Sequence, residues 1–173
     1  MTRALVLLLL LSGCGVYRWG YTPAGGTTVV AAPIFKNKTL RRGLEYALAQ
    51  HLRQRILDAT PLQLAGEDSG APVIQGTIVA VSQAPVIPNE NDQAPPIQST
   101  VSVTVSVALV SKAGNVLAGG PDGGPALLVE TENWVPTFGQ SAESAEDRCL
   151  KKLAERIVDL IEDEWGGPAA RKD

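Results

Sequence analysis

The chain has 173 residues, with 15 Lys or Arg against 18 Asp or Glu, and its formal net charge at pH 7 is -3. This length is enough for one domain with a substantial core, and the hydrophobic content of 45% is that of a globular protein. The acidic balance excludes nucleic acid as a general partner, because proteins that bind nucleic acid carry a basic footprint.

The first fourteen residues are typical of a secretory signal. Arg3 precedes an apolar run over residues 4–11, and the small residues Ser12 and Gly13 precede Cys14. The run is much shorter than the roughly 20 residues of a membrane-spanning helix. Its ending resembles the lipobox of bacterial lipoproteins, which predicts removal of residues 1–13 and a diacylglycerol and an N-acyl group on Cys14. The alternative is an ordinary signal peptide with an incidental cysteine.

An acylated Cys14 would leave Cys149 as a lone thiol, since the chain has 2 cysteines. A disulfide framework and a Cys-based zinc site are then excluded. Cys149 falls in the apolar stripe of the last predicted helix, so we expect it to be buried and inert. The covalent lipid on Cys14 is the one non-protein group that the sequence predicts, and we expect no cofactor.

Composition divides the rest of the chain into three parts. Residues 14–26 are rich in Gly and aromatic residues and are expected to be a lipidated tether. Their aromatic side chains either pack on the domain, as a short edge strand, or lie at the membrane interface. Residues 27–166 form the predicted folded domain, and residues 167–173 a disordered tail.

The domain begins with a predicted strand and a predicted helix. The β-branched run over residues 27–35 predicts the strand, and Pro33 requires an edge or a bulge near its end. The helix starts at about Leu40 or Gly43 and continues to Asp58, because its apolar residues recur with a 3.6-residue period.

Three further strands and a last helix follow. Residues 73–81 are the second predicted strand, and residues 99–111, with strict apolar and polar alternation, are the third. The 83–98 loop between them contains four prolines and is long for a compact domain, so it is either mobile or functional. The fourth strand begins at residues 116–117, is interrupted by a Gly- and Pro-rich insert at 119–125, and continues over 126–135.

An amphipathic pattern over residues 141–165 predicts the last helix. Each helix therefore has one apolar stripe, and the clearest strand has one apolar face. The predicted fold is α+β, with two helices packed on one face of a four-stranded, mostly antiparallel sheet in the order β-α-β-β-β-α.

No catalytic constellation is visible in the sequence. The single histidine, His51, lies at the border of an apolar stripe and is interpreted as a packed or surface residue. An enzyme with a site built from Glu90 and Asp92 is an alternative, but these residues lack the spacing of a calcium loop and suggest no substrate. Lys151, Lys152 and Arg156 are interpreted as the solvent face of the last helix.

One basic cluster precedes the first helix. With free backbone N–H groups it could bind an anion such as a phosphorylated glycolipid, and cations at a helix start do not stabilise the helix. The alternative is a solvated basic patch. The members of this cluster are Lys36, Lys38, Arg41 and Arg42.

The same region carries a family resemblance. A lipobox Cys in Cys14-Gly15-Val16-Tyr17, the strand ending at Phe35, and an amphipathic helix opening at Gly43-Leu44-Glu45 together resemble the LptE-type lipopolysaccharide-assembly lipoproteins. The most specific part is the pattern Pro-x-Phe-x-Asn-x-Thr, which here comprises Pro33, Phe35, Asn37 and Thr39. The order of strands and helices agrees over nearly the whole mature chain.

The resemblance implies a non-enzymatic protein. Its lipid on Cys14 would anchor it to the periplasmic side of the outer membrane. Its partners would be lipopolysaccharide and a large outer-membrane β-barrel protein, which it would help to assemble and would plug. The alternative function is that of a general envelope-binding lipoprotein without a role in lipopolysaccharide transport.

Overall fold

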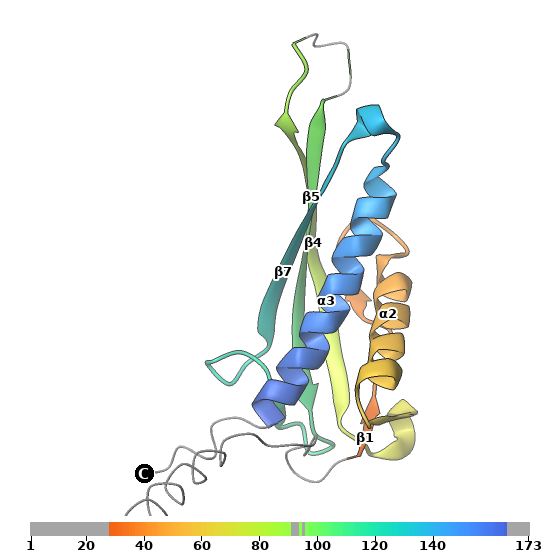
Figure 1. Cartoon of the computed structure of the whole chain (residues 1–173). Coiled ribbons are helices and arrows are strands. Elements are labelled where there is room, and N and C mark those ends of the chain that lie inside the picture. Colours follow the sequence, from red (N-terminus) through yellow and green to blue (C-terminus); the bar gives the residue numbers. More distant parts are fainter. Residues whose placement is uncertain (1–27, 91–93, 95, 166–173) are drawn as a thin grey trace, which may run out of the picture.

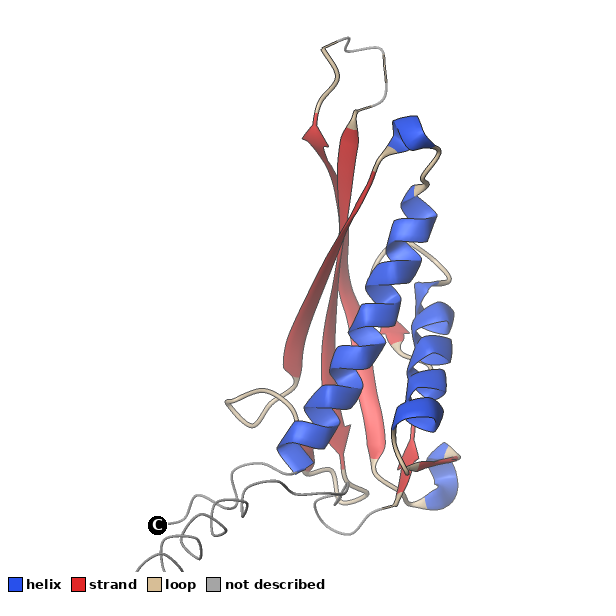
Figure 2. Cartoon of the chain, in the orientation of Figure 1, coloured by secondary structure: helices blue, strands red, loops and turns tan. Residues whose placement is uncertain are grey.

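A computed structural model describes residues 28–90, 94 and 96–165. Two helices cover one face of a single sheet and leave the other face open (Figures 1 and 2). The helices and strands follow in the order β1 (Val29–Ala31), β2 (Lys36–Asn37), α2 (Leu44–Ala59), β3 (Gln63–Ala65), β4 (Val73–Ile87), β5 (Gln98–Val110), β6 (Val116–Ala118), β7 (Ala126–Trp134) and α3 (Ala142–Trp165). Cys14, the predicted signal peptide and tether, and the predicted tail lie outside the described residues.

The sheet has seven strands and mixed pairing. Its path is β3-β1-β4-β5-β6, with β2 also paired to β4 and β7 to β5. The pairs among β1, β2, β3 and β4 are parallel, whereas β5 is antiparallel to β4, β6 and β7. The α+β class and the two helices on one face are confirmed, but the prediction of four mostly antiparallel strands is wrong.

Two of the extra strands arise from interruptions that the sequence already shows. Pro33 separates β1 from β2, which continue along β4 at Val73 and at Thr77 respectively. A proline in the strand interior would remove a ladder hydrogen bond, so the chain leaves the sheet there. The 119–125 insert likewise separates β6 from β7, and both then pair with β5.

The third extra strand, β3, was not predicted. It follows α2 and pairs in parallel with β1, from Val29 opposite Gln63 to Ala31 opposite Ala65. The segment from β1 through α2 to β3 is therefore a parallel crossover connection. A strand of three residues is too short to show an alternating pattern, and only its pairing identifies it.

The hairpin of β4 and β5 is longer than the sequence predicts. Pairing continues to Ile87 opposite Gln98, so part of the predicted 83–98 loop belongs to β4. The ladder shifts register between Ile78 and Ala80 and again between Pro85 and Ile87. In Figure 1 this hairpin projects beyond the end of α3.

The core lies between the sheet and the two helices. The alternation predicted for β5 is confirmed, since its odd-numbered valines are buried, whereas its Ser and Thr residues from Thr100 to Ser106 are only partly buried. The buried face of α2 and that of α3 follow the predicted stripes, and Cys149 is fully buried as expected. The helix residues with no more than 1% exposure in this core are Leu48, Leu52, Ile56, Ala145, Cys149, Leu150, Leu153, Ala154 and Ile157.

Candidate functional site

The segment that carries the family resemblance is built around Phe35. Its ring is buried at 3% exposure and lies against Gly76 of β4. A Cβ atom at Gly76 would be 2.1 Å from Cε2 of the ring, so only glycine leaves room for it. Phe35 therefore fixes the chain to β4 just before β2 begins.

Asn37 then turns the chain from β2 toward α2. Its Oδ1 accepts hydrogen bonds from the backbone N–H of Thr39 at 2.9 Å and from Thr39 Oγ1 at 2.7 Å. Its Nδ2 donates to the carbonyl of Arg41 at 2.7 Å and to Glu45 Oε2 at 2.6 Å. Such Asn-backbone bonds stabilise a turn. The Asn and Thr of the motif thus shape the loop that carries the basic residues.

Glu45 completes this network at the start of α2. Backbone N–H groups, first that of Glu45 itself, and then the Asn37 amide hold the pKa of Glu45 below its ordinary value. The carboxylate, rather than an external anion, therefore occupies the helix start, where a negative charge is favoured. This weakens the idea that the helix start itself binds a phosphate.

Arg41 is held away from the rest of the predicted cluster. Its guanidinium forms an ion pair with Glu146 of α3, with Nη2 2.8 Å from Oε1. Glu146 is buried at 5% exposure, and Gln83 of β4 donates a second hydrogen bond to it at 2.8 Å. A buried carboxylate requires such partners, so Arg41 has a structural role in joining the loop, β4 and α3.

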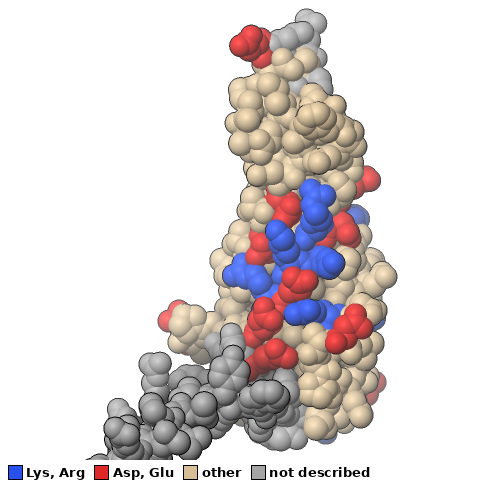
Figure 3. All heavy atoms as spheres, viewed as in Figure 1, with Lys and Arg blue, Asp and Glu red and all other residues tan. Residues whose placement is uncertain are grey.

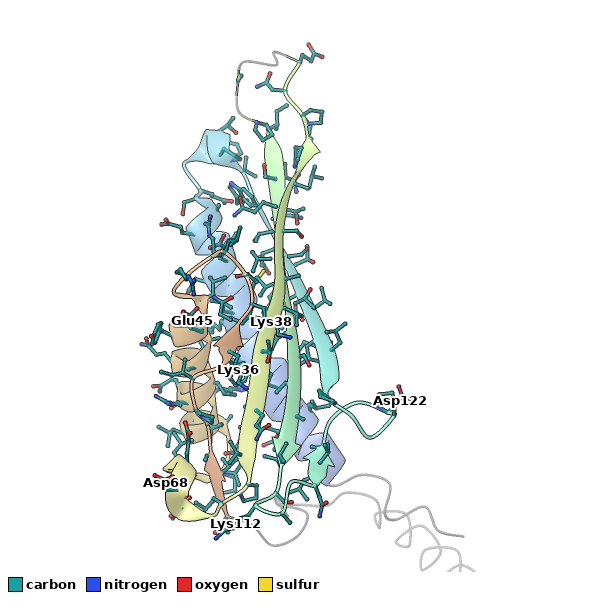
Figure 4. The ribbon with its side chains drawn as sticks, turned by 180° about the vertical axis from the view of Figure 1, so that it is seen from behind. Lys36, Lys38, Glu45, Asp68, Lys112 and Asp122 are labelled. Carbon is teal, nitrogen blue, oxygen red and sulfur yellow. The ribbon has the colours of Figure 1, made fainter. Side chains whose placement is uncertain are left out.

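The other basic residues remain exposed. Lys36 pairs in register with Thr77, so its side chain belongs to the open side of the sheet. Lys38 follows the end of β2, lies beside the β4 edge and is also exposed. Figure 4 shows both residues from this open side. Arg42 is exposed beside Glu45. The structure therefore leaves Lys36, Lys38 and Arg42 exposed and pairs Arg41 with α3.

The open face of the sheet is the largest feature without a cover among the described residues (Figure 4). It is uncharged across the three long strands, and Leu127 and Val129 on it are 65% and 46% exposed. At its lower part a shallow hollow of about 570 Å³ is bordered by Lys36 and Glu67. The residues that the pairing places on this face are Gln75, Thr77, Ala80, Ser82, Ala84, Thr100, Ser102, Thr104, Ser106, Ala108, Leu127, Val129, Thr131 and Asn133.

The helix side, in contrast, is strongly charged (Figure 3). Glu132 of β7 pairs with Lys152 and, at 3.2 Å, with Arg148, and Glu130 pairs with Arg156 at 2.7 Å. The hydrogen bond from Lys152, followed by that from Arg148, holds the pKa of Glu132 below its ordinary value. Lys152 and Arg156 were predicted to face only solvent, but they lie half-exposed along β7 and join it to α3.

No catalytic arrangement is found in the described part of the chain. His51 is bound through Nε2 to Asp147 Oδ1 at 2.8 Å, between the two helices. Burial raises the pKa of the Cys149 thiol to about 11, which keeps it protonated and unreactive at neutral pH. Within residues 28–90, 94 and 96–165, no group of His, Cys, Asp and Glu is placed to hold a metal ion. None of the helices described has the length and apolarity needed to cross a membrane.

Glu146 is the site residue that the sequence analysis missed. It is 105 residues from Arg41, so no local pattern connects them. A signal was nevertheless present, because Ala142 and Cys149 lie four residues before and three after Glu146. Those spacings put the carboxylate on the apolar face of a helix, where it needs a buried partner.

The comparisons with known proteins agree with this architecture. A family model described as LptE, lipopolysaccharide-assembly, matches residues 27–163. No curated protein matches the chain.

Several solved bacterial structures are similar. A protein from Chlamydia trachomatis superposes with a TM-score of 0.51 at 10% identity, covering 78% of this chain and 98% of that one, which indicates a shared fold. A minor lipoprotein from Acinetobacter baumannii gives a TM-score of 0.47 at 17% identity over 78% and 92% of the two chains. Lipoprotein B from Nitrosomonas europaea gives 0.48 at 11% identity over 83% and 91%.

Proposed function

Since the chain belongs to the LptE lipopolysaccharide-assembly family, we propose that it is a lipid-anchored, non-enzymatic plug of a large outer-membrane β-barrel protein. In this proposal the acyl groups on Cys14 hold the domain at the periplasmic side of the outer membrane. Several acyl chains anchor a protein firmly, whereas one does so only marginally. The domain then helps the barrel to assemble and takes part in moving lipopolysaccharide to the cell surface.

The open sheet face is the observation that supports this proposal most directly. An antiparallel sheet that faces only water usually carries charged residues on its outer side, because these keep it from associating. Here β4, β5 and β7 present Ser, Thr, Ala, Leu and Val instead. A surface with small polar and apolar groups can lie against the wall of a partner without burying an unpaired charge.

A co-purification experiment tests this function. The full chain, tagged at its C-terminus, is extracted in detergent from its own membranes, and the large outer-membrane barrel protein is measured in the eluate. We expect Ser102→Glu with Thr104→Glu to reduce the barrel recovered by about tenfold or more, because it buries charge in the contact. Gln50→Glu with Gln54→Glu, on the exposed side of α2, is the matched control and should leave the recovery unchanged.

Two results would contradict the proposal. The first is the absence of the barrel from the eluate of the unaltered chain. The second is equal recovery with the sheet variant and with its α2 control. Capture of a different envelope component would instead support the general envelope-binding lipoprotein.

The exposed basic residues are proposed to contact acidic groups of lipopolysaccharide or of the barrel. Lys36→Ser, Lys38→Ser and Arg42→Ser together should weaken binding of lipopolysaccharide to the chain, measured directly with labelled lipopolysaccharide. Arg41→Ser alone is the informative comparison, because Arg41 is already paired with Glu146. Unchanged affinity in the triple variant would leave these residues as a solvated patch.

A further inference from the structure

Two long strand edges in the described sheet have no neighbouring strand over several residues. One is covered by charged side chains and the other is not. The first is the outer edge of β7. Arg148 Nη2 donates to the carbonyl of Asn133 at 3.0 Å, and Arg156 Nη1 donates to that of Val129 at 2.7 Å. These guanidinium groups occupy edge carbonyls that another strand would need. Charged side chains of this kind are the common way to block an edge.

The second edge is the part of β4 beyond Ile78. The parallel pairing with β2 ends where the backbone N–H of Lys38 donates to the carbonyl of Ile78 at 3.0 Å. None of the described strands pairs with β4 on this side after that point, whereas β5 continues on the other side to Ile87. Residues 79–87 of this edge include no charged side chain.

The orientation of the backbone at this edge follows from Pro85. Proline has no N–H to donate, so in a paired strand it is accommodated where that N–H would point away from the ladder. The register with β5 is continuous from Val81 to Pro85, and backbone direction alternates with period two. The N–H and C=O groups of Val81 and Gln83 therefore point outward, away from β5.

A groove runs beside these outward groups. Its volume is about 600 Å³, and it lies between the β4 edge and the loop that follows β2. Leu40 on the loop side is 99% exposed. The residues that line the groove are Lys38, Thr39, Leu40, Arg41, Val79, Ala80, Val81 and Gln83.

We propose that this groove accepts an extended segment of the barrel partner, which adds to the sheet as a strand beside residues 79–83 and places a carboxylate near Lys38. The inference rests on the proposed function and specifies how the partner is held. Strand addition of this kind gains its affinity from main-chain hydrogen bonds and its selectivity from side-chain contacts.

The charges around the groove favour this occupant. Arg41 is neutralised by Glu146, but Lys38 is exposed and has no acidic partner in the described part of the chain. A carboxylate on the added segment supplies that partner. A second copy of this chain would bring the same cation and an edge with no carboxylate, so it is disfavoured. The apolar side chain of Leu40 would cover the added strand.

Hydrogen exchange of the complex tests the inference without any substitution. Backbone amides of residues 79–83 are compared in the isolated chain and in the co-purified barrel complex. We expect the outward amides of Val81 and Gln83 to exchange at least about tenfold more slowly in the complex, because each gains a hydrogen bond. Outer-edge amides of β7 should not change.

A complex with unprotected 79–83 amides overturns the strand addition while leaving the plug function intact. Absence of any complex overturns both.

A pair of variants at one position gives an independent test. Gln83→Ala and Gln83→Pro both remove the hydrogen bond to Glu146, but only proline also removes the outward N–H. We expect Gln83→Pro to recover about tenfold less barrel than Gln83→Ala, provided that thermal unfolding shows both to be folded. Equal recovery by the two variants, or a protected edge that appears in a dimer of this chain alone, would contradict the proposal.

Discussion

Phe35 and Gly76 show at the residue scale how the segment before α2 is held. The ring fills the space that a side chain at position 76 would occupy, and this contact fixes where β2 meets β4. Asn37 then fixes the loop through four hydrogen bonds to Thr39, Arg41 and Glu45. The residues that carry the family resemblance therefore have a structural role, because they shape the loop that carries the basic side chains.

A substitution at Gly76 tests this contact. In Gly76→Ala the new Cβ would lie 2.1 Å from the Phe35 ring, so the ring or the backbone must move. Overpacking of this kind should lower the free energy of unfolding by about 1–3 kcal/mol, measured by urea denaturation. Gly66→Ala is the control, because nothing lies within 4 Å of its Cβ and its φ is not positive. An equal effect at both positions would show that Phe35 is free to move aside.

The candidate site could be predicted from the sequence only in part. Lys36, Lys38 and Arg41 are neighbours in the chain, and their proximity suggested one anion site. Strand alternation places Lys36 on the open face, whereas Lys38 lines the groove beside β4 and the Arg41 side chain pairs with Glu146 of α3. The position of the Arg41 side chain depends on the distant Glu146, and no local pattern contains a contact across 105 residues.

The element scale is dominated by the ion pairs between α3 and β7. These ion pairs join β7 to α3 along the edge of the core. The helical period of the sequence places Lys152 and Arg156 on the polar face of α3. It cannot show whether that face contacts solvent or the edge of a neighbouring strand. In the same way, Pro33 predicted an interruption of the first strand, but the pairing of β2 with β4 needed the tertiary structure.

Acid should weaken the contact at Glu132. Lys152 and Arg148 hold the pKa of Glu132 below its ordinary value in the folded state. Glu132 therefore stabilises the fold above the unfolded-state pKa of about 4.3, and this contribution is lost as the pH falls through the lower folded-state value. In Glu132→Gln the free energy of unfolding should fall less steeply between about pH 5 and about pH 3. Lys151→Ser, which removes an exposed side chain of α3 but no carboxyl, should keep the steepness of the unaltered chain.

Removing the arginines from the β7 edge should promote self-association. Arg148→Ala with Arg156→Ala exposes the carbonyls of Asn133 and Val129, which a second chain can then use. We expect concentration-dependent dimers or larger species in sedimentation velocity, with about 1–3 kcal/mol of unfolding free energy lost per ion pair, because the carboxylates of Glu130 and Glu132 are mostly buried. A chain with Arg42→Ala and Lys151→Ala loses the same charge without exposing an edge and should stay monomeric. Monomeric behaviour of both would mean that β7 is protected in another way.

At the scale of the whole molecule, the two ends of the long axis differ in chemistry. The described chain begins with β1 at the end opposite the projecting hairpin (Figure 1). The hairpin end is nearly without charge, as the upper part of Figure 3 shows. Val86, Ile87 and Ile97 there are 48%, 44% and 43% exposed. Exposed apolar groups gathered at one end indicate a contact surface.

This arrangement predicts that stability and partner binding can be separated. The buried core residues of β5 begin at Val101, apart from Ser99, so the hairpin beyond Pro85 contributes little to the core. Replacing residues 86–98 by Asn-Gly joins Pro85 and Ser99, which are already paired, through a two-residue turn. We expect the free energy of unfolding to change by less than about 1 kcal/mol, because none of the described residues in the removed segment is buried and the entropy of closing the loop is small.

The same shortened chain should recover less barrel from membranes, since it lacks the apolar end while keeping the open face and the groove beside β4. Thermal unfolding and co-purification are measured on one preparation, so loss of binding cannot be attributed to loss of fold. A large fall in stability would place the hairpin within the folding unit. Full recovery of the barrel by a shortened chain of normal stability would show that the hairpin end is not needed for the contact. The sheet face and the groove would then be the remaining contact surfaces.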